Sequence, residues 1–368
     1  MTSNYAELAS KQASKQASKQ ARRNPYLDFV KFFTIFLVIV GHVTQQTAVL
    51  SCVPIQEDPL FRLIYTSHMP LFMGISGYFF CKSVYKSASL HNYVKNKLKK
   101  RLLGLFIPML SFGVLKSIWA LGWGWPAFYP EQVKRIWFLG DLAINTLLVL
   151  GALYFCNGIF RHDLKYFFVA MLFSAVPKIG YGSDGLFMYI FFVLGFFIAR
   201  YKVNTSFYLK YWKFLLMSFV MIYLVFSMLL PWPPQNFTLD FSHQSILNIV
   251  IIDIFKVILG GVGSYLILVS IYYLMPRLSH TSLGKNAIKY GAYTLDIYLL
   301  QILFVEMTFG PMYKHWVNNG GIDFMNIYGI GIRTIAIVLF SILLLKIILL
   351  ISDFLNRSTF LTKLFFYR

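Results

Sequence analysis

The chain has 368 residues, of which 58% are hydrophobic and 18% aromatic, whereas only 13% are charged. An average soluble domain carries about 25% charged residues, so a water-soluble globule is excluded. The formal net charge of +20 would suggest a nucleic-acid partner in a soluble protein, but its distribution along this chain points elsewhere. The three cysteines, Cys52, Cys81 and Cys156, have neither metal-binding nor redox spacing.

The first 23 residues are polar and contain three copies of Ala-Ser-Lys-Gln between Ala9 and Gln20. Such a segment has no apolar surface to bury, so residues 1–23 are predicted to be a disordered, basic, low-complexity tail. No short apolar core with a small-residue cleavage site precedes the first apolar segment, so we expect that segment to be an uncleaved helix.

Ten apolar segments follow, and a membrane-spanning helix needs about 20 residues. They are residues 27–50, 60–81, 102–125, 136–158, 165–181, 185–200, 211–231, 246–275, 291–311 and 327–351. The fifth and sixth are short and flank a glycine-rich junction, which is compatible with a re-entrant pair. The sequence therefore predicts an all-α polytopic membrane protein of about ten transmembrane helices. Its membrane domain is expected to cover residues 24–356, followed by a cytoplasmic tail at 357–368.

Lysine and arginine residues fall mainly between alternate segments. With the N-terminus inside, 24 of the 34 basic residues lie in inner segments and 4 in outer ones. This asymmetry predicts a multi-pass protein of the cell membrane with both termini in the cytoplasm. The net charge is then an orientation signal that also attracts anionic membrane lipid, and no nucleic-acid partner is expected. One dense run, Lys95 to Arg101, is either a solvated cluster or a site for the phosphates of a nucleotide cofactor.

The first apolar segment carries three ionisable residues, Asp28, Lys31 and His42. Charges within a span are costly and therefore mark functional sites by default. Lys31 and His42 are eleven residues apart, which places them within about 20° of one helix face and about 16 Å apart along the axis. Asp28 precedes Lys31 by three residues, a spacing that suits an ion pair. An interfacial Lys–Asp pair with a structurally satisfied histidine is an equally good interpretation.

The second apolar segment places His68 two residues before Pro70, and small residues recur at Gly74 and Gly77. A proline with small residues permits a kink and a close approach of helices. A single buried histidine is more often hydrogen-bonded in a core than catalytic. The chain contains no His-x-x-x-His pair, nucleophile elbow, phosphate-binding loop or dinucleotide fingerprint, so neither a metal site nor a soluble-enzyme mechanism is expected.

Taken together, these residues resemble the acyltransferase-3 family of integral membrane acyltransferases, and within it the fucose 4-O-acetylase-like branch. The strings that carry the resemblance are Asp28-Phe29-Val30-Lys31 with His42, His68-Met69-Pro70-Leu71-Phe72, Ile75-Ser76-Gly77-Tyr78, Lys99-Lys100-Arg101 with Pro108, Trp137-Phe138-Leu139, and Tyr293-Thr294-Leu295 with Ile297-Tyr298-Leu299-Leu300. The similarity covers roughly residues 24–351. Gly104 stands where the family has a further basic residue, and Gln301 stands where it commonly has a histidine.

The resemblance implies a ten-helix enzyme that transfers an acyl group, usually acetyl from acetyl-CoA, to a hydroxyl of a glycan or lipid-linked sugar. A bacterial inner membrane and polysaccharide modification are implied in the same way. In this interpretation His42 is the general base, or else accepts the acetyl group covalently. Lys31, next to Asp28, holds a CoA phosphate or developing negative charge. Candidate binding residues for the two substrates are His68, Ser76, Lys100, Arg101 and Trp137.

Two other functions use the same residues. A flippase or transporter of a lipid-linked sugar would use the buried polar groups as a translocation path, although the two halves of the chain show no convincing repeat. A non-catalytic membrane scaffold leaves the charged first span unexplained. Binding of CoA discriminates the transferase from both.

Overall fold

The computed structural model describes residues 24–48, 55, 58–122, 136–156, 165–174, 182–202, 209–229, 246–323 and 330–367. The predicted N-terminal tail lies outside these residues. Regular structure in the described part of the chain is entirely helical, which confirms the predicted all-α class.

The helices take these bounds: α2 Pro25–Ala48, α3 Pro59–Tyr85, α4 Leu90–Tyr93, η2 Val94–Leu98, α5 Lys99–Gly122, α7 Trp137–Phe155, α8 Lys165–Ser174, α9 Gly182–Tyr201, α11 Trp212–Leu229, α12 Ile246–Leu278, α13 Ser282–Tyr290, α14 Thr294–Gln301, η4 Ile302–Phe309, α15 Gly310–Asn318, α16 Ile330–Arg357 and α17 Thr359–Phe366. Within the described residues, six helical stretches are long and apolar enough to cross a membrane, and two apolar helices are shorter. The protein is therefore a multi-pass membrane protein, whereas the count of ten spans and the side of each terminus stay predictions.

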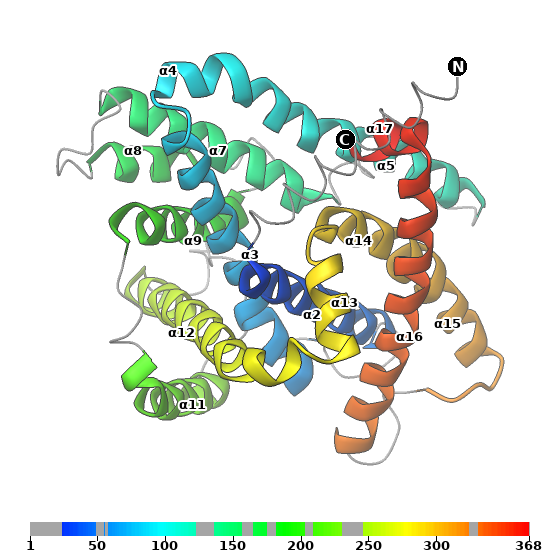
Figure 1. Cartoon of the computed structure of the whole chain (residues 1–368). Helices are drawn as coiled ribbons and strands as arrows, with labels where there is room; N and C mark the ends of the chain where they lie inside the picture. The colour runs from blue at the N-terminus through cyan, green and yellow to red at the C-terminus, as the bar shows by residue number, and fades with distance from the viewer. Residues whose placement is uncertain are drawn as a thin grey trace, which may run out of the picture.

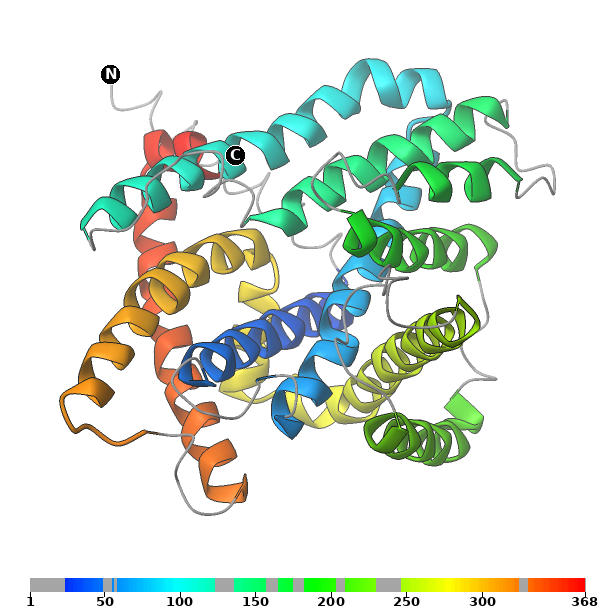
Figure 2. The same cartoon turned by 180° about the vertical axis from the view of Figure 1, so that it is seen from behind.

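Helices α2 and α3 lie at the centre of the bundle (Figures 1 and 2). Helix α12 packs against α3 on one side, and α14, η4 and α16 pack against α2 on the other. Central placement explains the sequence of α2, in which Val30, Ile35 and Val43 are fully buried at spacings that turn them to different faces. The two segments that carry the charged and histidine residues are thus the ones most enclosed by other helices.

Helix α3 crosses α9 at very close range. A Cβ atom added to Gly77 would overlap the carbonyl group of Phe192, and one added to Gly195 would overlap the carbonyl group of Gly74. Only glycine permits such contact between two backbones. The predicted close approach at the small residues of the second segment is therefore confirmed.

The outer surface of the bundle is apolar. Helices α8, α11 and α16 expose large hydrophobic side chains, among them Leu172, Phe214 and Leu350. In water such a surface would aggregate, whereas in a bilayer it contacts acyl chains. Apolar side chains therefore occupy both the core and the outer surface, as a bilayer permits.

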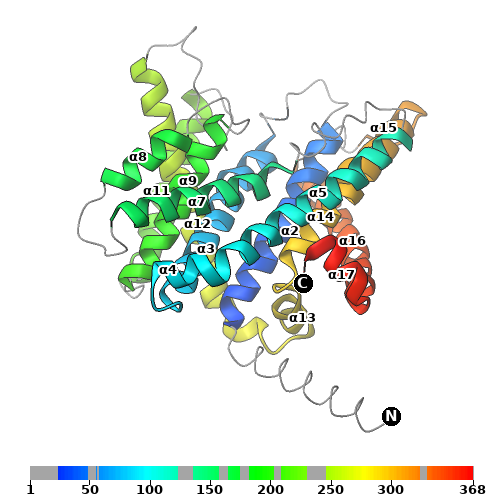
Figure 3. The same cartoon turned by 90° about the horizontal axis from the view of Figure 1, so that it is seen from above.

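Three features differ from the simple span pattern. The predicted ninth span is divided into α14, the π-helix η4 and α15, and a short capped helix, α13, precedes it. Most of the predicted C-terminal tail forms α17, which docks on α5 (Figure 3). There the Ser111 hydroxyl donates a hydrogen bond to the carbonyl oxygen of Leu364 at 2.8 Å, and the Phe112 ring lies 5.9 Å from that of Phe366.

Candidate active site

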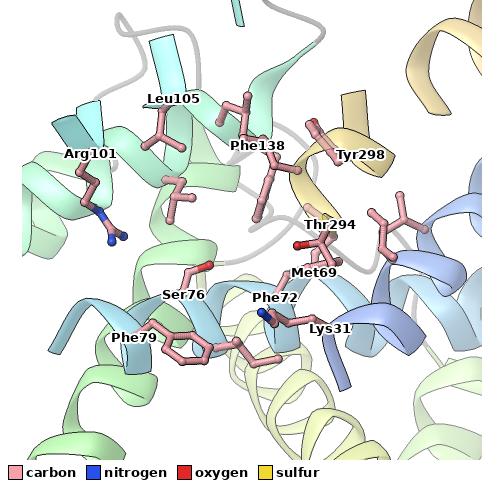
Figure 4. Close-up of a pocket in the computed structure, with 16 residues that line it drawn as sticks. Lys31, Met69, Phe72, Ser76, Phe79, Arg101, Leu105, Phe138, Thr294 and Tyr298 are labelled. Atoms are coloured by element: carbon pink, nitrogen blue, oxygen red, sulfur yellow. The ribbon is translucent and has the colours of Figure 1, made fainter. Parts of the chain in front are cut away.

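A cavity of about 260 Å³ lies between α2, α3, α5, α7 and α14. Three of the residues singled out from the sequence, Lys31, Ser76 and Arg101, line it together. In Figure 4, Arg101 enters from α5 and Lys31 from α2, with Ser76 of α3 between them. The rest of the wall is mainly apolar, so these few polar groups are placed to orient a ligand.

One face of α2 runs from this cavity towards His42. Lys31, Ile35 and Val38 line the cavity, and His42 is the next residue on the same face, four positions beyond Val38. His42 itself is not part of the cavity wall but retains 20% of its side-chain surface. Lys31 and His42 therefore share one face of α2, as predicted, with the apolar residues Ile35 and Val38 between them.

Lys31 is paired within its own helix. Its Nζ atom lies 2.7 Å from Oδ1 of Asp28, and the ammonium group also lies 5.4 Å from the centre of the Phe79 ring. Asp28 is almost completely buried, whereas Lys31 retains 20% of its side-chain surface. Asp28 thus faces the lysine rather than the cavity, and the lysine offers its remaining surface to a ligand.

Arg101 and Lys100 are neighbours in sequence but face different surroundings. The Nε–H group of Arg101 donates a hydrogen bond to Oγ1 of Thr146 at 3.2 Å, and its guanidinium carbon lies 5.0 Å from the centre of the Phe80 ring. No carboxylate among the described residues forms an ion pair with it. Lys100 is exposed together with Lys95 and Lys99, so it forms part of a surface cluster outside the cavity.

His42 meets two charged groups that the sequence analysis did not single out. Its Nδ1 atom lies 3.1 Å from Oε1 of Glu306, in η4, and Oε2 of the same carboxylate accepts a hydrogen bond from Lys116 Nζ, in α5, at 3.5 Å. The His42–Glu306 approach has ion-pair distance without hydrogen-bond alignment, which is common in catalytic pairs before substrate binds. Lys116 is completely buried, whereas Glu306 retains 18% of its surface. The carboxylate therefore bridges an enclosed ammonium group and a partly open imidazole.

The π-helix η4 sets the direction of Glu306. A π-helical turn closes i→i+5 hydrogen bonds, so each turn holds more residues than an α-helical one and rotates the helix beyond it. Such turns occur frequently at functional sites. The signal available in the sequence was a pair of acids, Asp296 and Glu306, in the ninth span and one base, Lys116, in the third, each of which is costly in a membrane without a partner.

The other predicted binding residues lie outside the cavity wall. His68 is buried, and its Nδ1 atom lies 2.7 Å from the carbonyl oxygen of Ile64 in its own helix. Trp137 packs edge-on against Phe138 with ring centres 6.1 Å apart, and Phe138 lines the cavity. His68 thus has the structural partner that a core histidine needs, and Trp137 supports the wall from behind. Gln301 is fully buried in α14.

The site offers acid–base and electrostatic chemistry. With Glu306 beside Nδ1, the proton of a neutral imidazole is favoured on Nδ1, which leaves the lone pair of Nε2 free to accept another proton. Within the described part of the chain, no group of three histidine, cysteine or acidic residues is placed to hold a metal ion.

Comparisons with known proteins identify the family of the chain. A family model described as "Acyltransferase domain", that of the acyltransferase-3 family, matches residues 24–346. Nodulation protein NolL of Mesorhizobium japonicum is 24% identical over 349 residues, which cover 87% of each chain. Nodulation protein NolL of Sinorhizobium fredii is 31% identical over 135 residues, 34% of this chain and 36% of the relative. No solved structure matches. The chain belongs to the acyltransferase-3 family and is a membrane acyltransferase.

Proposed function

We propose that this acyltransferase moves an acetyl group from cytoplasmic acetyl-CoA to a hydroxyl group of a surface polysaccharide or lipid-linked sugar. The observation that carries the proposal is the α2 face that presents Lys31 to the cavity and carries His42, whose Nδ1 atom lies 3.1 Å from Oε1 of Glu306, one turn beyond the last cavity residue, Val38. A flippase would need the polar residues but has no use for an imidazole oriented by a carboxylate.

The donor fits the cavity by size and charge. A cavity of about 260 Å³ is too small for all of CoA but suits the thioester and part of the pantetheine arm. Arg101 and Lys31, which line the cavity, donate hydrogen bonds to the amide carbonyl oxygens of that arm. The nucleotide phosphates then lie outside, against the exposed cluster of Lys95, Lys99 and Lys100, and the donor enters from the cytoplasm.

His42 supplies the proton transfer. In the proposed step, Nε2 of His42 takes the proton of the acceptor hydroxyl while the hydroxyl oxygen forms a bond to the thioester carbonyl carbon. The C–S bond then breaks, and the thiolate of CoA leaves and takes the proton from the imidazolium. Glu306 stabilises the imidazolium between the two transfers. A covalent route, in which Nε2 first takes the acetyl group, uses the same residues.

The acceptor and the location follow from the resemblance to the fucose 4-O-acetylase-like branch. That branch implies a sugar hydroxyl, and both curated relatives come from bacteria, so we place the enzyme in a bacterial inner membrane. His42 lies towards the end of α2 opposite the basic run, which suits an acceptor that arrives from the outer side.

The test compares glycans from cells that express wild type, His42→Ala, His280→Ala or no protein. His280 is an exposed histidine far along the chain, so its variant controls for the loss of any histidine. Mass spectrometry of surface and lipid-linked glycans should detect one added acetyl group with wild type and His280→Ala only. We expect His42→Ala to lose at least about 10²-fold in rate.

Two results would contradict the proposal. Full activity of purified His42→Ala would remove the imidazole from the chemistry. An absence of any acetyl increment with wild type, together with no change of its thermal midpoint on addition of acetyl-CoA, would reject the transferase and favour sugar transport.

A further inference from the structure

Lys116 is a lysine with no exposed side-chain surface, and its Nζ atom lies 3.5 Å from Oε2 of Glu306. Lysine is rarely buried completely, because an ammonium group loses its hydration unless charge and hydrogen bonds replace it. Here the replacement is the carboxylate whose other oxygen faces His42 at 3.1 Å. One carboxylate therefore serves two basic groups.

We propose that Lys116 is a positioning residue that balances the charge of Glu306 and so keeps His42 neutral, and able to accept a proton, at rest. This inference rests on the proposed role of His42 as the base. In this proposal, Lys116 sets the pH range over which His42 can act as the base.

The charges of Lys116 and Glu306 determine whether the neighbouring His42 holds a proton at rest. With Lys116 protonated and Glu306 ionised, the pair is neutral and His42 can remain neutral beside it. Without the ammonium group, the basic group that remains beside the ionised carboxylate, within the part of the chain that the structure describes, is His42, so the pair takes up a proton. An imidazole that already holds this proton cannot remove one from a hydroxyl.

Other titratable groups at the cluster leave this balance in place. The Tyr65 side chain of α3 is close enough to Glu306 to interact with it, and its hydroxyl donates a hydrogen bond to Gln45 at 3.2 Å. His68 of α3 is close enough to His42 to repel a second positive charge there. Among the described residues, Lys116 supplies the positive charge opposite Oε2 of Glu306.

The experiment measures the protonation of His42 without relying on acetyl transfer. Diethyl pyrocarbonate modifies neutral imidazole, so its rate of reaction with His42 against pH, followed by peptide mass spectrometry on full-length protein in detergent, gives a titration midpoint. His280 provides an internal reference in every sample. We compare wild type, Lys116→Met, Lys116→Arg and Glu306→Gln.

We expect Lys116→Met to raise the His42 midpoint by about one pH unit or more, and Lys116→Arg to retain the wild-type midpoint. In the transfer assay, Lys116→Met should lose about tenfold in rate at neutral pH and recover at higher pH, a rescue that a merely structural role would not produce. Glu306→Gln should move the midpoint the other way, because it leaves the ammonium group facing His42.

An unchanged midpoint in Lys116→Met overturns the inference. If Lys116→Met does not fold, Lys116→Gln, which also removes the charge, takes its place, because Glu306→Gln alone reports the effect of the carboxylate and not that of Lys116. If wild type transfers no acetyl group, the proposed function fails, whereas the midpoints still report whether Lys116 controls the protonation of His42.

Discussion

Two lysine–carboxylate pairs in this protein serve the same helix, α2, but differ in how they are built. Lys31 and Asp28 are three residues apart on one helix and meet at 2.7 Å, so their contact follows from helix geometry alone. Lys116 and Glu306 are 190 residues apart, on α5 and η4, and meet at 3.5 Å beside His42. The local pair lies at the cavity proposed to hold the donor, and the distant pair lies at His42, the proposed base.

The two pairs differ in the stage of folding at which each can form. A local pair forms as soon as the helix forms and contributes to a single helix. A distant pair exists only when three helices are assembled, so the charge environment of His42 depends on the complete fold.

Loss of the bridging carboxylate is expected to have the largest effect. Glu306→Gln removes the group that orients His42 and stabilises the imidazolium, so turnover should fall by about 10²- to 10⁴-fold. It also leaves the fully buried Lys116 without its carboxylate, which costs about 3–5 kcal/mol of stability. Turnover and thermal midpoint of purified enzyme check both effects.

The control for this variant is Asp353→Asn. Asp353 pairs with Lys289 at 3.4 Å, but both side chains are more than one-third exposed. Such a pair contributes at most about 1 kcal/mol, and Asp353 is remote from the cavity wall. Equal losses in the two variants would show that any carboxylate matters to folding and that Glu306 has no special role.

The contrast between local and distant contacts also explains which helices and site residues could be predicted from the sequence. The periodic apolar runs predicted α2 and α12 to within about three residues at each end, because long apolar helices are determined locally. Lys31, Ser76 and Arg101 were predicted and do meet in one cavity. They could be found because each belongs to a short string with a recognisable pattern.

Glu306 and Lys116 could not be predicted as partners of His42. Their contact depends on how α5 and η4 pack, and on a π-helical turn for which the sequence Ile302–Phe309 carries no local signal. The short helices α13 and α17 were missed for a related reason. They are stabilised by caps and by docking, such as Phe366 on Phe112, rather than by a long apolar run.

Removal of a cavity cation is expected to have an intermediate effect. Arg101→Leu should raise the KM for acetyl-CoA by about tenfold with little change in kcat, since a charge-assisted contact contributes about 1.5–3 kcal/mol. Lys31→Met should raise it less, because Asp28 already compensates part of the lysine charge. Steady-state kinetics with varied donor give both values.

A matched control is Lys100→Met, which removes one exposed charge next to Arg101 in sequence. We expect the KM of the Lys100→Met variant for acetyl-CoA to change by less than about threefold at physiological salt, because exposed charges are screened. A larger effect for Lys100→Met than for Arg101→Leu would place the donor on the surface cluster and outside the cavity.

The smallest effect should come from the local pair itself. Asp28→Asn removes the carboxylate that partly neutralises Lys31, and so leaves a full positive charge at the cavity. We expect the KM for the anionic donor to fall by about two- to threefold and stability to fall by about 1 kcal/mol, since Asp28 also lies in the first turn of α2. Donor titration and thermal unfolding measure the two changes. A rise in KM would instead show that Asp28 acts by aiming the ammonium group, which would make the local pair a positioning device like the distant one.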